Sequence, residues 1–392
     1  MTTQAKILAA IERRAEELTA LSRRIHANPE LRFAEHQAAG WLAGAVEAAG
    51  VTVERGLAGM PTAFRACVGK SAPGAPRVAI LAEYDALPEI GHACGHNLIA
   101  AGALGAFLGL CEAAADLPGE VVLLGTPAEE GGGGKIKLIA AGAFEGLDAA
   151  MMFHPFDRDI LAHGALASEW LTFSFTGKAS HAAGAPWDGN SALSAVIQTF
   201  NLIDSQRVHF RDGTRVHGFI TNGGQAVNII PEHAACQFSV RATNTTYLTK
   251  LTDQVLACAR AAALATRTEL AVSRETGYAD MRNNLALARA FGRHLAGLGR
   301  PAPEVDLDVG MGSTDMGDVS HVVPAIHPYL GICDKDAAMC HQQDFVRHAA
   351  SDRGMQAMLA AARAMALCAE EVLRDGALRE AMRAEFAGAA AA

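Results

Sequence analysis

The order of apolar and amphipathic segments is the feature that most constrains how this chain folds. Short apolar runs of strand length alternate with segments in which apolar residues recur every three or four positions. The strand-like runs are Thr62–Val68, Arg77–Ala82, Glu120–Thr126 and Ala149–Phe153. The helical segments are 2–26, 35–49, 98–115 and 135–141. This alternation predicts an α/β domain with a mostly parallel mixed sheet flanked by helices.

The pattern changes in the middle of the chain. From Trp170 the strand and helix signals follow the order β-α-β-β-α-β, which is the ferredoxin-like arrangement. These segments are 170–176, 191–206, 216–221, 234–241, 246–265 and 269–273. Signals of the first kind resume at 284–298, 325–330 and 351–373. We therefore expect an α/β domain in two parts, 1–166 and 279–392, interrupted by a ferredoxin-like βαββαβ domain at 167–278.

Composition narrows the class of protein and its partners. Half of the 392 residues are apolar and only 19% are charged, which is typical of a folded chain and not of a disordered one. The net charge is -9 and no Lys/Arg run is present, so we expect no nucleic-acid partner. The longest apolar run, Leu98–Cys111, is too short to span a bilayer, so we expect no membrane partner. Eight scattered cysteines form no disulfide framework and indicate a reducing cytoplasm.

Polar clusters follow several of the predicted strands. In open α/β sheets, ligands bind beyond the carboxyl ends of the strands. The first cluster, residues 91–97, holds Cys94 and His96, and a thiolate and an imidazole are both good ligands for zinc and similar ions. The alternative is a glycine-rich turn with incidental polar residues, and spacing alone does not decide between the two.

Two adjacent carboxylates, Glu129 and Glu130, form the second cluster, between an apolar strand and four glycines. Adjacent carboxylates suit a division of labour in which one holds a cation and the other transfers a proton. The usual alternative is a solvated acidic loop. Glycines could also cradle a phosphate, but the spacing of a P-loop is absent.

Single histidines carry weaker signals. His154 follows a further strand, and His341 lies after Cys340 near the C-terminus. Within the ferredoxin-like segment, His181, Asn228 and Arg241 lie at strand ends or between strands. Considered alone, these residues fit ordinary turn chemistry or surface charge better than a binding site, although the place of His154 at a further strand end favours a ligand.

Longer strings resemble one known family. They are ALPEIGHACGHN at 86–97, GTPAEEGGGGK at 125–135, FHP at 153–155, KASHAA at 178–183, NIIPE at 228–232 and GSTDMGDVS at 312–320. In this order they resemble the aminoacylase/carboxypeptidase-type metallopeptidases, which have a catalytic domain and an inserted lid, or dimerisation, domain. The chain looks most like the amidohydrolase branch, which includes beta-alanyl-lysine-type dipeptidases, aminobenzoyl-glutamate hydrolases and indole-acetyl-amino-acid hydrolases.

The resemblance implies a role for each matching residue. Metal ligands of two divalent ions match five positions: Cys94, His96, Glu130, His154 and His341. Glu129 matches the general base, and Asp85 the aspartate that orients a ligand histidine. His181 matches a lid histidine that reaches the partner subunit's active site and stabilises the oxyanion. Asn228 and Arg241 match lid positions that hold the substrate and its carboxylate.

Three positions depart from the wider family. Glu83 stands where the wider family has a ligand histidine, although this branch lacks that histidine as a whole. Asn97 replaces the aspartate that the branch usually has after C-G-H. Cys94 stands where the wider family has a bridging aspartate, and a soft thiolate there changes the metal preference and makes the site oxidisable.

The resemblance therefore implies hydrolysis of a small amide or dipeptide bearing a free carboxylate, by a homodimer or higher homo-oligomer of the chain. Aminobenzoyl-glutamate and N-acyl amino acids are the alternative substrates, and zinc, manganese and cobalt are the candidate ions. Two non-hydrolytic alternatives are a metal- or substrate-binding protein and a redox sensor that uses Cys94. The presence of Glu129 argues against the first.

Overall fold

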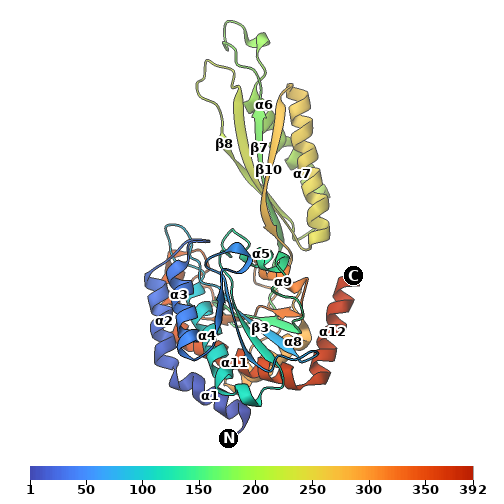
Figure 1. Ribbon diagram of the computed structural model, residues 1–392. Coiled ribbons are helices and arrows are strands. Elements are labelled where there is room, and N and C mark those ends of the chain that lie inside the picture. Colours follow the sequence, from blue (N-terminus) through green and yellow to red (C-terminus); the bar gives the residue numbers. More distant parts are fainter. Residues whose placement is uncertain (392) are drawn as a thin grey trace. The chain divides into compact units, whose positions relative to one another are not determined.

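The structure, a computed structural model, describes residues 1–391 (Figure 1). The chain divides into two compact units. Unit 1 joins Met1–Gly164 to the segment that begins at Met281, and unit 2 is Ala165–Asp280. Each unit has its own apolar core, since the buried side chains form two separate clusters.

The centre of unit 1 is a six-stranded sheet in the order β1-β2-β4-β3-β5-β11. Neighbours from β4 to β11 run parallel, whereas β1–β2 and β2–β4 are antiparallel. A separate parallel pair joins β6 to β12. The strands are β1 (Val53–Arg55), β2 (Phe64–Gly69), β3 (Arg77–Ala82), β4 (Glu120–Gly125), β5 (Ala149–Met151), β6 (His154–Phe156), β11 (Ala325–Ile326) and β12 (Tyr329–Gly331). β3 and β4 are almost entirely buried, as expected for parallel strands with both faces covered.

The helices of unit 1 lie on this sheet or pack on the helices that cover it. They are α1 (Thr3–Arg13), α2 (Ala15–Ala27), α3 (His36–Ala48), α4 (His96–Glu112), α5 (Gly134–Ala140), α8 (Leu285–Gly297), α9 (Met316–Ser320), α10 (Gln343–Ala349), α11 (Asp352–Arg374) and α12 (Gly376–Ala391). α4 packs against α1, α2, α11 and the strands β3 and β4. Glycine allows this close approach, because a Cβ at Gly105 would lie 2.8 Å from a methyl carbon of Leu18.

Unit 2 is a four-stranded antiparallel sheet in the order β10-β7-β9-β8, with two helices that pack on it. Its elements are β7 (Ala167–Thr176), α6 (Ala192–Gln206), β8 (Arg215–Asn222), β9 (His233–Ala242), α7 (Thr245–Thr266) and β10 (Glu269–Tyr278). Their order along the chain and across the sheet is that of a ferredoxin-like fold. The predicted fold class is thus confirmed, a mostly parallel α/β domain interrupted by a βαββαβ domain.

Local differences from the sequence prediction have identifiable causes. The expected helix 2–26 is two helices, because Arg14 leaves helical geometry at φ -97°, ψ 3°. The expected strand 325–330 is divided between β11 and β12, with His327 and Pro328 between them. Proline has no N–H to donate, and the Pro328 carbonyl instead accepts a hydrogen bond from the His154 N–H at 2.8 Å. The sequence patterns missed β1, β6, α9, α10 and α12. Among residues 1–391, no helix combines the length and apolarity needed to cross a bilayer.

Candidate metal centre

Segments that are distant in the sequence deliver polar side chains to one region of unit 1. β3 and β4 are parallel neighbours, so the residues after them emerge at the same edge of the sheet. β3 leads to Glu83 and Asp85, and β4 leads to Glu129 and Glu130. α4 begins at His96, after Gly95 in the left-handed region at φ +73°. A side chain at position 95 would also lie 2.9 Å from Pro155.

The loop after β4 contains backbone conformations and close contacts that few residue types can adopt. Ala128 has φ +63°, a costly conformation for a residue with a Cβ. Its N–H donates a 2.9 Å hydrogen bond to buried Glu35. A Cβ at Gly134 would lie 1.8 Å from the Pro127 carbonyl oxygen, so only glycine fits there. The glycine run thus allows the loop to fold back on itself and holds the two carboxylates at the sheet edge.

Three of the predicted ligands form one compact group. Side-chain donor atoms of Cys94, His96 and Glu130 all lie within 4.8 Å of one another. Nε2 of His96 is buried without a hydrogen-bond partner among the described residues, as is Oε1 of Glu130. That nitrogen is 3.9 Å from the Glu130 oxygen. Two ligands that each bind an ion at about 2.1 Å are separated by roughly 3 to 4 Å, so this group has the spacing of a cation site.

His154 and His341 complete the predicted set at its edges. A ring nitrogen of His154 lies within 4.8 Å of the Cys94 sulfur, in a second group that includes Cys340. His341 is more open, with a 60% exposed side chain, and its Nε2 is 3.6 Å from Oε2 of Glu130. It adopts φ +68°, and its N–H donates to the Ala93 carbonyl at 3.0 Å. This strained backbone directs the imidazole towards Glu130.

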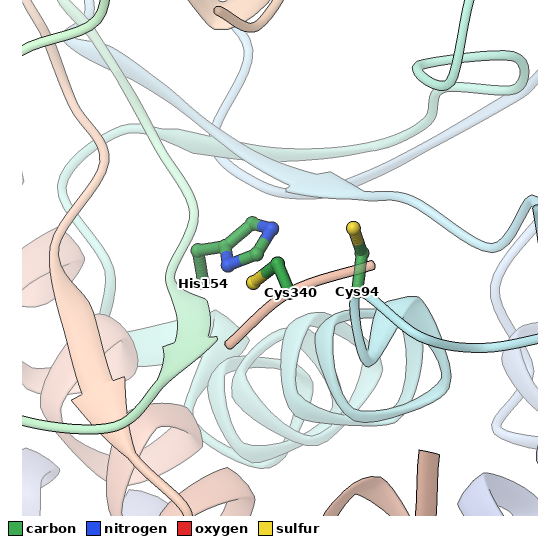
Figure 2. A group of neighbouring side chains, drawn as sticks. All are labelled: Cys94, His154 and Cys340. Atoms are coloured by element: carbon green, nitrogen blue, oxygen red, sulfur yellow. The ribbon is translucent and has the colours of Figure 1, made fainter. Parts of the chain in front are cut away.

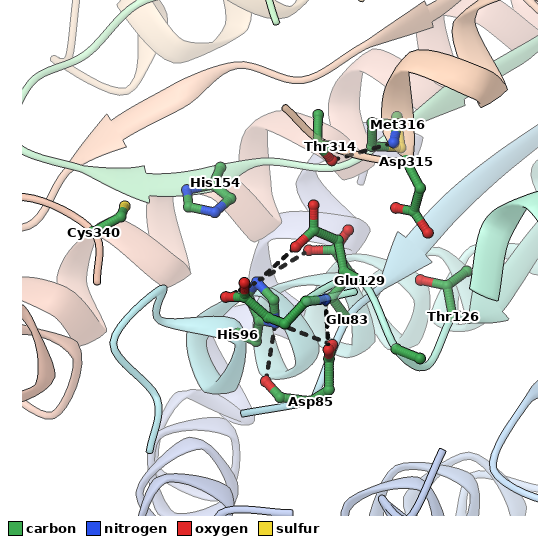
Figure 3. A network of polar contacts seen from close by, with 12 residues as sticks. Glu83, Asp85, His96, Thr126, Glu129, His154, Thr314, Asp315, Met316 and Cys340 are labelled. Carbon is green, nitrogen blue, oxygen red and sulfur yellow. Dashed lines mark hydrogen bonds and ion pairs between the residues drawn. The ribbon is translucent and has the colours of Figure 1, made fainter. Parts of the chain in front are cut away.

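Asp85 connects the two loops that carry the predicted ligands His96 and Glu130 (Figure 3). Its Oδ1 is 3.2 Å from Nδ1 of His96, and its Oδ2 accepts a 2.8 Å hydrogen bond from the Glu130 N–H. The Asp85 carbonyl also lies 3.0 Å from that Nδ1. Both contacts require a proton on Nδ1, so Nε2 of a neutral His96 presents its lone pair to the group of ligands.

The electrostatics of this region favour a bound cation. Burial raises the pKa of Glu129 well above its usual value, and the charges of Glu83 and Glu130 raise it further. Burial alone would lower the pKa of His96, but Asp85, Glu83 and Glu130 together raise it well above the ordinary range. Without a metal, the surrounding carboxylates therefore favour the protonated form of this histidine. A divalent cation would replace that proton and stabilise the ionised carboxylates, so the donor set fits divalent metal ions.

Sequence reasoning missed a second buried cluster beside the first. Nζ of Lys135 forms ion pairs with Glu83 and with Asp315, the latter at 2.6 Å, and all three side chains are at most 1% exposed. Asp315 lies in the GSTDMGDVS string and Lys135 directly follows the glycine run, so both were visible only as parts of longer strings. Cys340 was recognised only as the neighbour of His341. No local pattern indicates that these residues meet the first cluster.

Unit 2 places its predicted site residues at two ends of its sheet. His181 pairs with Ile229 in an isolated bridge, and the Ala182 N–H donates to the Asn228 carbonyl at 3.0 Å. Nδ1 of His181 accepts N–H bonds from residues 183 and 184, so Nε2 carries the proton of the neutral ring. Arg241 lies near the far end of β9, opposite Ser168 of β7. Burial lowers the pKa of its guanidinium, which still stays charged at neutral pH.

Comparison with known proteins defines the class. A crystal structure of a dinuclear metal-binding M20-family peptidase from Bacillus subtilis has the same fold, with a TM-score of 0.72 at 19% identity, covering 92% of this chain and 99% of that one. The model of peptidase family M20/M25/M40 matches residues 79–364. The chain belongs to this family and is a metal-dependent hydrolase that acts on C–N bonds.

Two curated relatives are also similar over much of their length. The Xaa-Arg dipeptidase of Mus musculus is 42% identical over 391 residues, which span 96% of this chain and 90% of that protein. A p-aminobenzoyl-glutamate hydrolase chain of Escherichia coli K12 is 33% identical over 318 residues, 74% of this chain and 64% of that one. These relatives correspond to two of the groups named from the sequence strings.

Proposed function

We propose that the protein is a dipeptidase that uses two divalent ions, held by Cys94, His96, Glu130, His154 and His341. The convergence of these five side chains with Glu129, although they come from four separate segments, is the observation that carries the proposal. The bound ions would acidify a water molecule and polarise the scissile carbonyl. Asp85 would orient His96 and hold the Glu130 loop through the contacts described above.

Glu129 is proposed as the general base. Its Oε2 lies 3.9 Å from Nε2 of His96, so it adjoins the proposed ligands while Glu130 acts as one of them. It would accept a proton from the attacking water and deliver it to the leaving amine. Burial excludes competing bulk water from this carboxylate, which is 8% exposed.

Glu129→Gln tests this role directly. We expect the variant to bind the same number of ions as the wild type but to lose activity by a factor of about 10² to 10⁴, because the amide cannot accept the proton. Metal content by mass spectrometry and kcat on the best substrate are the measurements. Glu145→Gln, at an exposed carboxylate, is the control. A near-normal kcat for Glu129→Gln at full metal content would exclude this base.

Dipeptides with a basic C-terminal residue are the proposed substrate class. The relative named as an Xaa-Arg dipeptidase supports this proposal, since it matches along nearly the whole chain. Aminobenzoyl-glutamate is the second candidate, supported by a relative of which this chain covers a smaller share. Hydrolysis of Xaa-Arg and Xaa-Lys dipeptides, aminobenzoyl-glutamate and N-acyl amino acids by the metal-loaded protein would decide between them. N-acyl amino acids as the best substrates would contradict both.

The ends of the unit 2 sheet suggest why a dimer is needed. His181 and Asn228 lie near the start of β9 and Arg241 near its end, and the eight residue steps from His233 to Arg241 span roughly 26 Å. An extended dipeptide spans only about 7 Å. One small substrate therefore cannot contact both ends of one unit 2. We propose that Nε2–H of His181, supplied by the partner subunit, donates to the oxyanion, and that Arg241 binds the substrate carboxylate.

Mixing two inactive variants tests this division. His181→Ala and Arg241→Ala should each lose most activity as homodimers. After unfolding and refolding together, the mixed dimer should regain activity, because one of its two sites has both residues intact. If mixed dimers are demonstrated by mass spectrometry and no activity returns, both residues act from the same subunit or lie outside the site. A cytoplasmic location is also proposed, because all eight cysteines are free thiols.

A further inference from the structure

We propose that Cys340 is an additional metal ligand, so that one of the two ion positions is bound by two thiolates. This inference rests on the proposed metal centre and adds a donor that the sequence strings do not assign. It makes the two ion positions chemically unequal.

The geometry of three side chains carries the inference (Figure 2). Donor atoms of Cys94, His154 and Cys340 all lie within 4.8 Å of one another. They come from three segments: the loop before α4, the start of β6 and the segment that leads to α10. Cys94 belongs to this group and also to the group with His96 and Glu130. Two neighbouring donor sets that share one sulfur have the arrangement of a pair of adjacent ion positions.

His154 is fixed in the form that a metal requires. Its Nδ1 is 2.7 Å from the Pro155 carbonyl oxygen, an acceptor only, so Nδ1 must donate. The proton of the neutral ring is therefore on Nδ1, and Nε2 has a free lone pair for a cation. The same kind of contact orients His96 through Asp85 on the other side of Cys94.

Cys340 is held in place but has no strong partner for its sulfur. Apart from the Cys94 thiol, its hydrogen-bond contact in the described chain is to the Pro155 carbonyl at 4.0 Å, which is long even for sulfur. The next residue, His341, is anchored by the bond from its N–H to the Ala93 carbonyl. Ala93 is adjacent to Cys94, so this backbone bond ties the segments of the two cysteines together. The sulfur is thus positioned by backbone contacts that do not use the thiol itself.

The donor types predict which ion each position prefers. The group of Cys94, His96 and Glu130 offers sulfur, nitrogen and oxygen, whereas the group of Cys94, His154 and Cys340 offers two sulfurs and one nitrogen. Soft thiolates favour zinc, cobalt or cadmium over manganese and magnesium. Each thiol must lose its proton to the solvent when the ion binds. The thiolate-rich position should therefore select a thiophilic ion, while the other position tolerates harder ones.

Cobalt titration of the metal-free protein tests the inference without relying on activity. Thiolate-to-cobalt charge transfer absorbs in the near ultraviolet, and its intensity grows with the number of Co–S bonds. Cys340→Ser should lose a large part of this band and bind zinc at the second position at least about tenfold more weakly. Its manganese affinity should stay close to that of the wild type. Cys67→Ser, at an exposed cysteine on β2, is the matched control and should leave both readouts unchanged.

The results separate this inference from the proposed function. If the wild type binds two cobalt ions and Cys340→Ser keeps the full band and zinc affinity, Cys340 is not a ligand, while the five-ligand centre stands. If the wild type binds no divalent ion with a thiolate band, the centre itself is wrong. A second readout is alkylation by iodoacetamide: bound zinc should protect Cys340 in the wild type, and equal labelling with and without zinc would overturn the inference.

Discussion

Two clusters of buried charge adjoin each other in unit 1, and they are neutralised in different ways. The ligand cluster, defined by Cys94, His96, Glu130, His154, Cys340 and His341, contains no lysine or arginine. The lysine cluster, defined by Glu83, Lys135 and Asp315, contains its own cation. Glu83, Glu129 and Asp315 have oxygens within 4.8 Å of one another, a spacing that could also suit an ion.

Lys135 occupies the position that an ion would take in the lysine cluster. Its Nζ pairs with both Glu83 and Asp315, and its backbone N–H donates to Asp315 at 3.1 Å. Burial alone would lower the pKa of Lys135, but the charges of Asp315 and Glu83 raise it, so the ammonium stays charged. Burial raises the pKa of Asp315 to about 6, with Lys135 opposing the rise, and this carboxylate is ionised at neutral pH.

The comparison shows that buried negative charge at one sheet edge can be neutralised in two ways. A lysine side chain neutralises it permanently, whereas a bound cation neutralises it reversibly. A covalently attached ammonium gives the lysine cluster a fixed neutralisation that no chelator removes. The ligand cluster leaves Nε2 of His96 and Oε1 of Glu130 buried without hydrogen-bond partners among the described residues, so a bound cation could neutralise it in a way that a chelator reverses. The sequence resemblance predicts that Glu83 stands at the position of a ligand histidine, and its partner here is Lys135.

Removing the lysine should have the largest effect on stability. Lys135→Met leaves two buried carboxylates without a counter-charge, and breaking a buried ion pair costs about 3 to 5 kcal/mol. Urea denaturation measures this change, with Lys250→Met on the exposed face of α7 as the control. The double variant Lys135→Met/Glu83→Gln should recover part of the loss, because it removes one of the stranded charges. A loss below about 1 kcal/mol would show that the lysine cluster is not neutralised by Lys135.

A smaller effect should appear at Glu35, a buried carboxylate for which neither a lysine nor a proposed ligand supplies a counter-charge. Burial, with a contribution from Asp85, raises its pKa from 4.5 to about 7. Because the folded pKa lies above the unfolded one, its contribution to stability is fully present below pH 4.5 and is lost as the pH rises through about 7. The difference between the two pKa values lowers the free energy of unfolding by up to about 3 kcal/mol at pH 8.

Glu35→Gln should remove this dependence, since the amide oxygen can still accept the N–H groups of Phe33 and Ala128. The variant should match the wild type at pH 5 and become the more stable protein by pH 8. Urea denaturation across that range measures the difference, with exposed Glu16→Gln as the control. A constant difference at all pH values would mean that Glu35 does not titrate in this range.

Much of the fold was predictable because its signals are local. The buried runs of β3 and β4 and the helical periodicity of α4 and α11 fix element type within a few residues. The elements that were missed are short or depend on partners. β6 has three residues and exists through its pairing with β12, and α10 lies in a segment with little apolar periodicity.

The sequence by itself determined the family, and it predicted the proposed ligands and the order of the segments that bear them, because motif strings and strand periodicity depend on neighbouring residues. Only the tertiary structure decided which charged or metal-binding side chains lie next to one another. Lys135 meets Glu83 and Asp315, and Cys340 meets Cys94 and His154, across separations that no local pattern spans. The physical reason is that desolvation and Coulomb energy depend on distance in space, which is set when the sheet and its loops close around these groups.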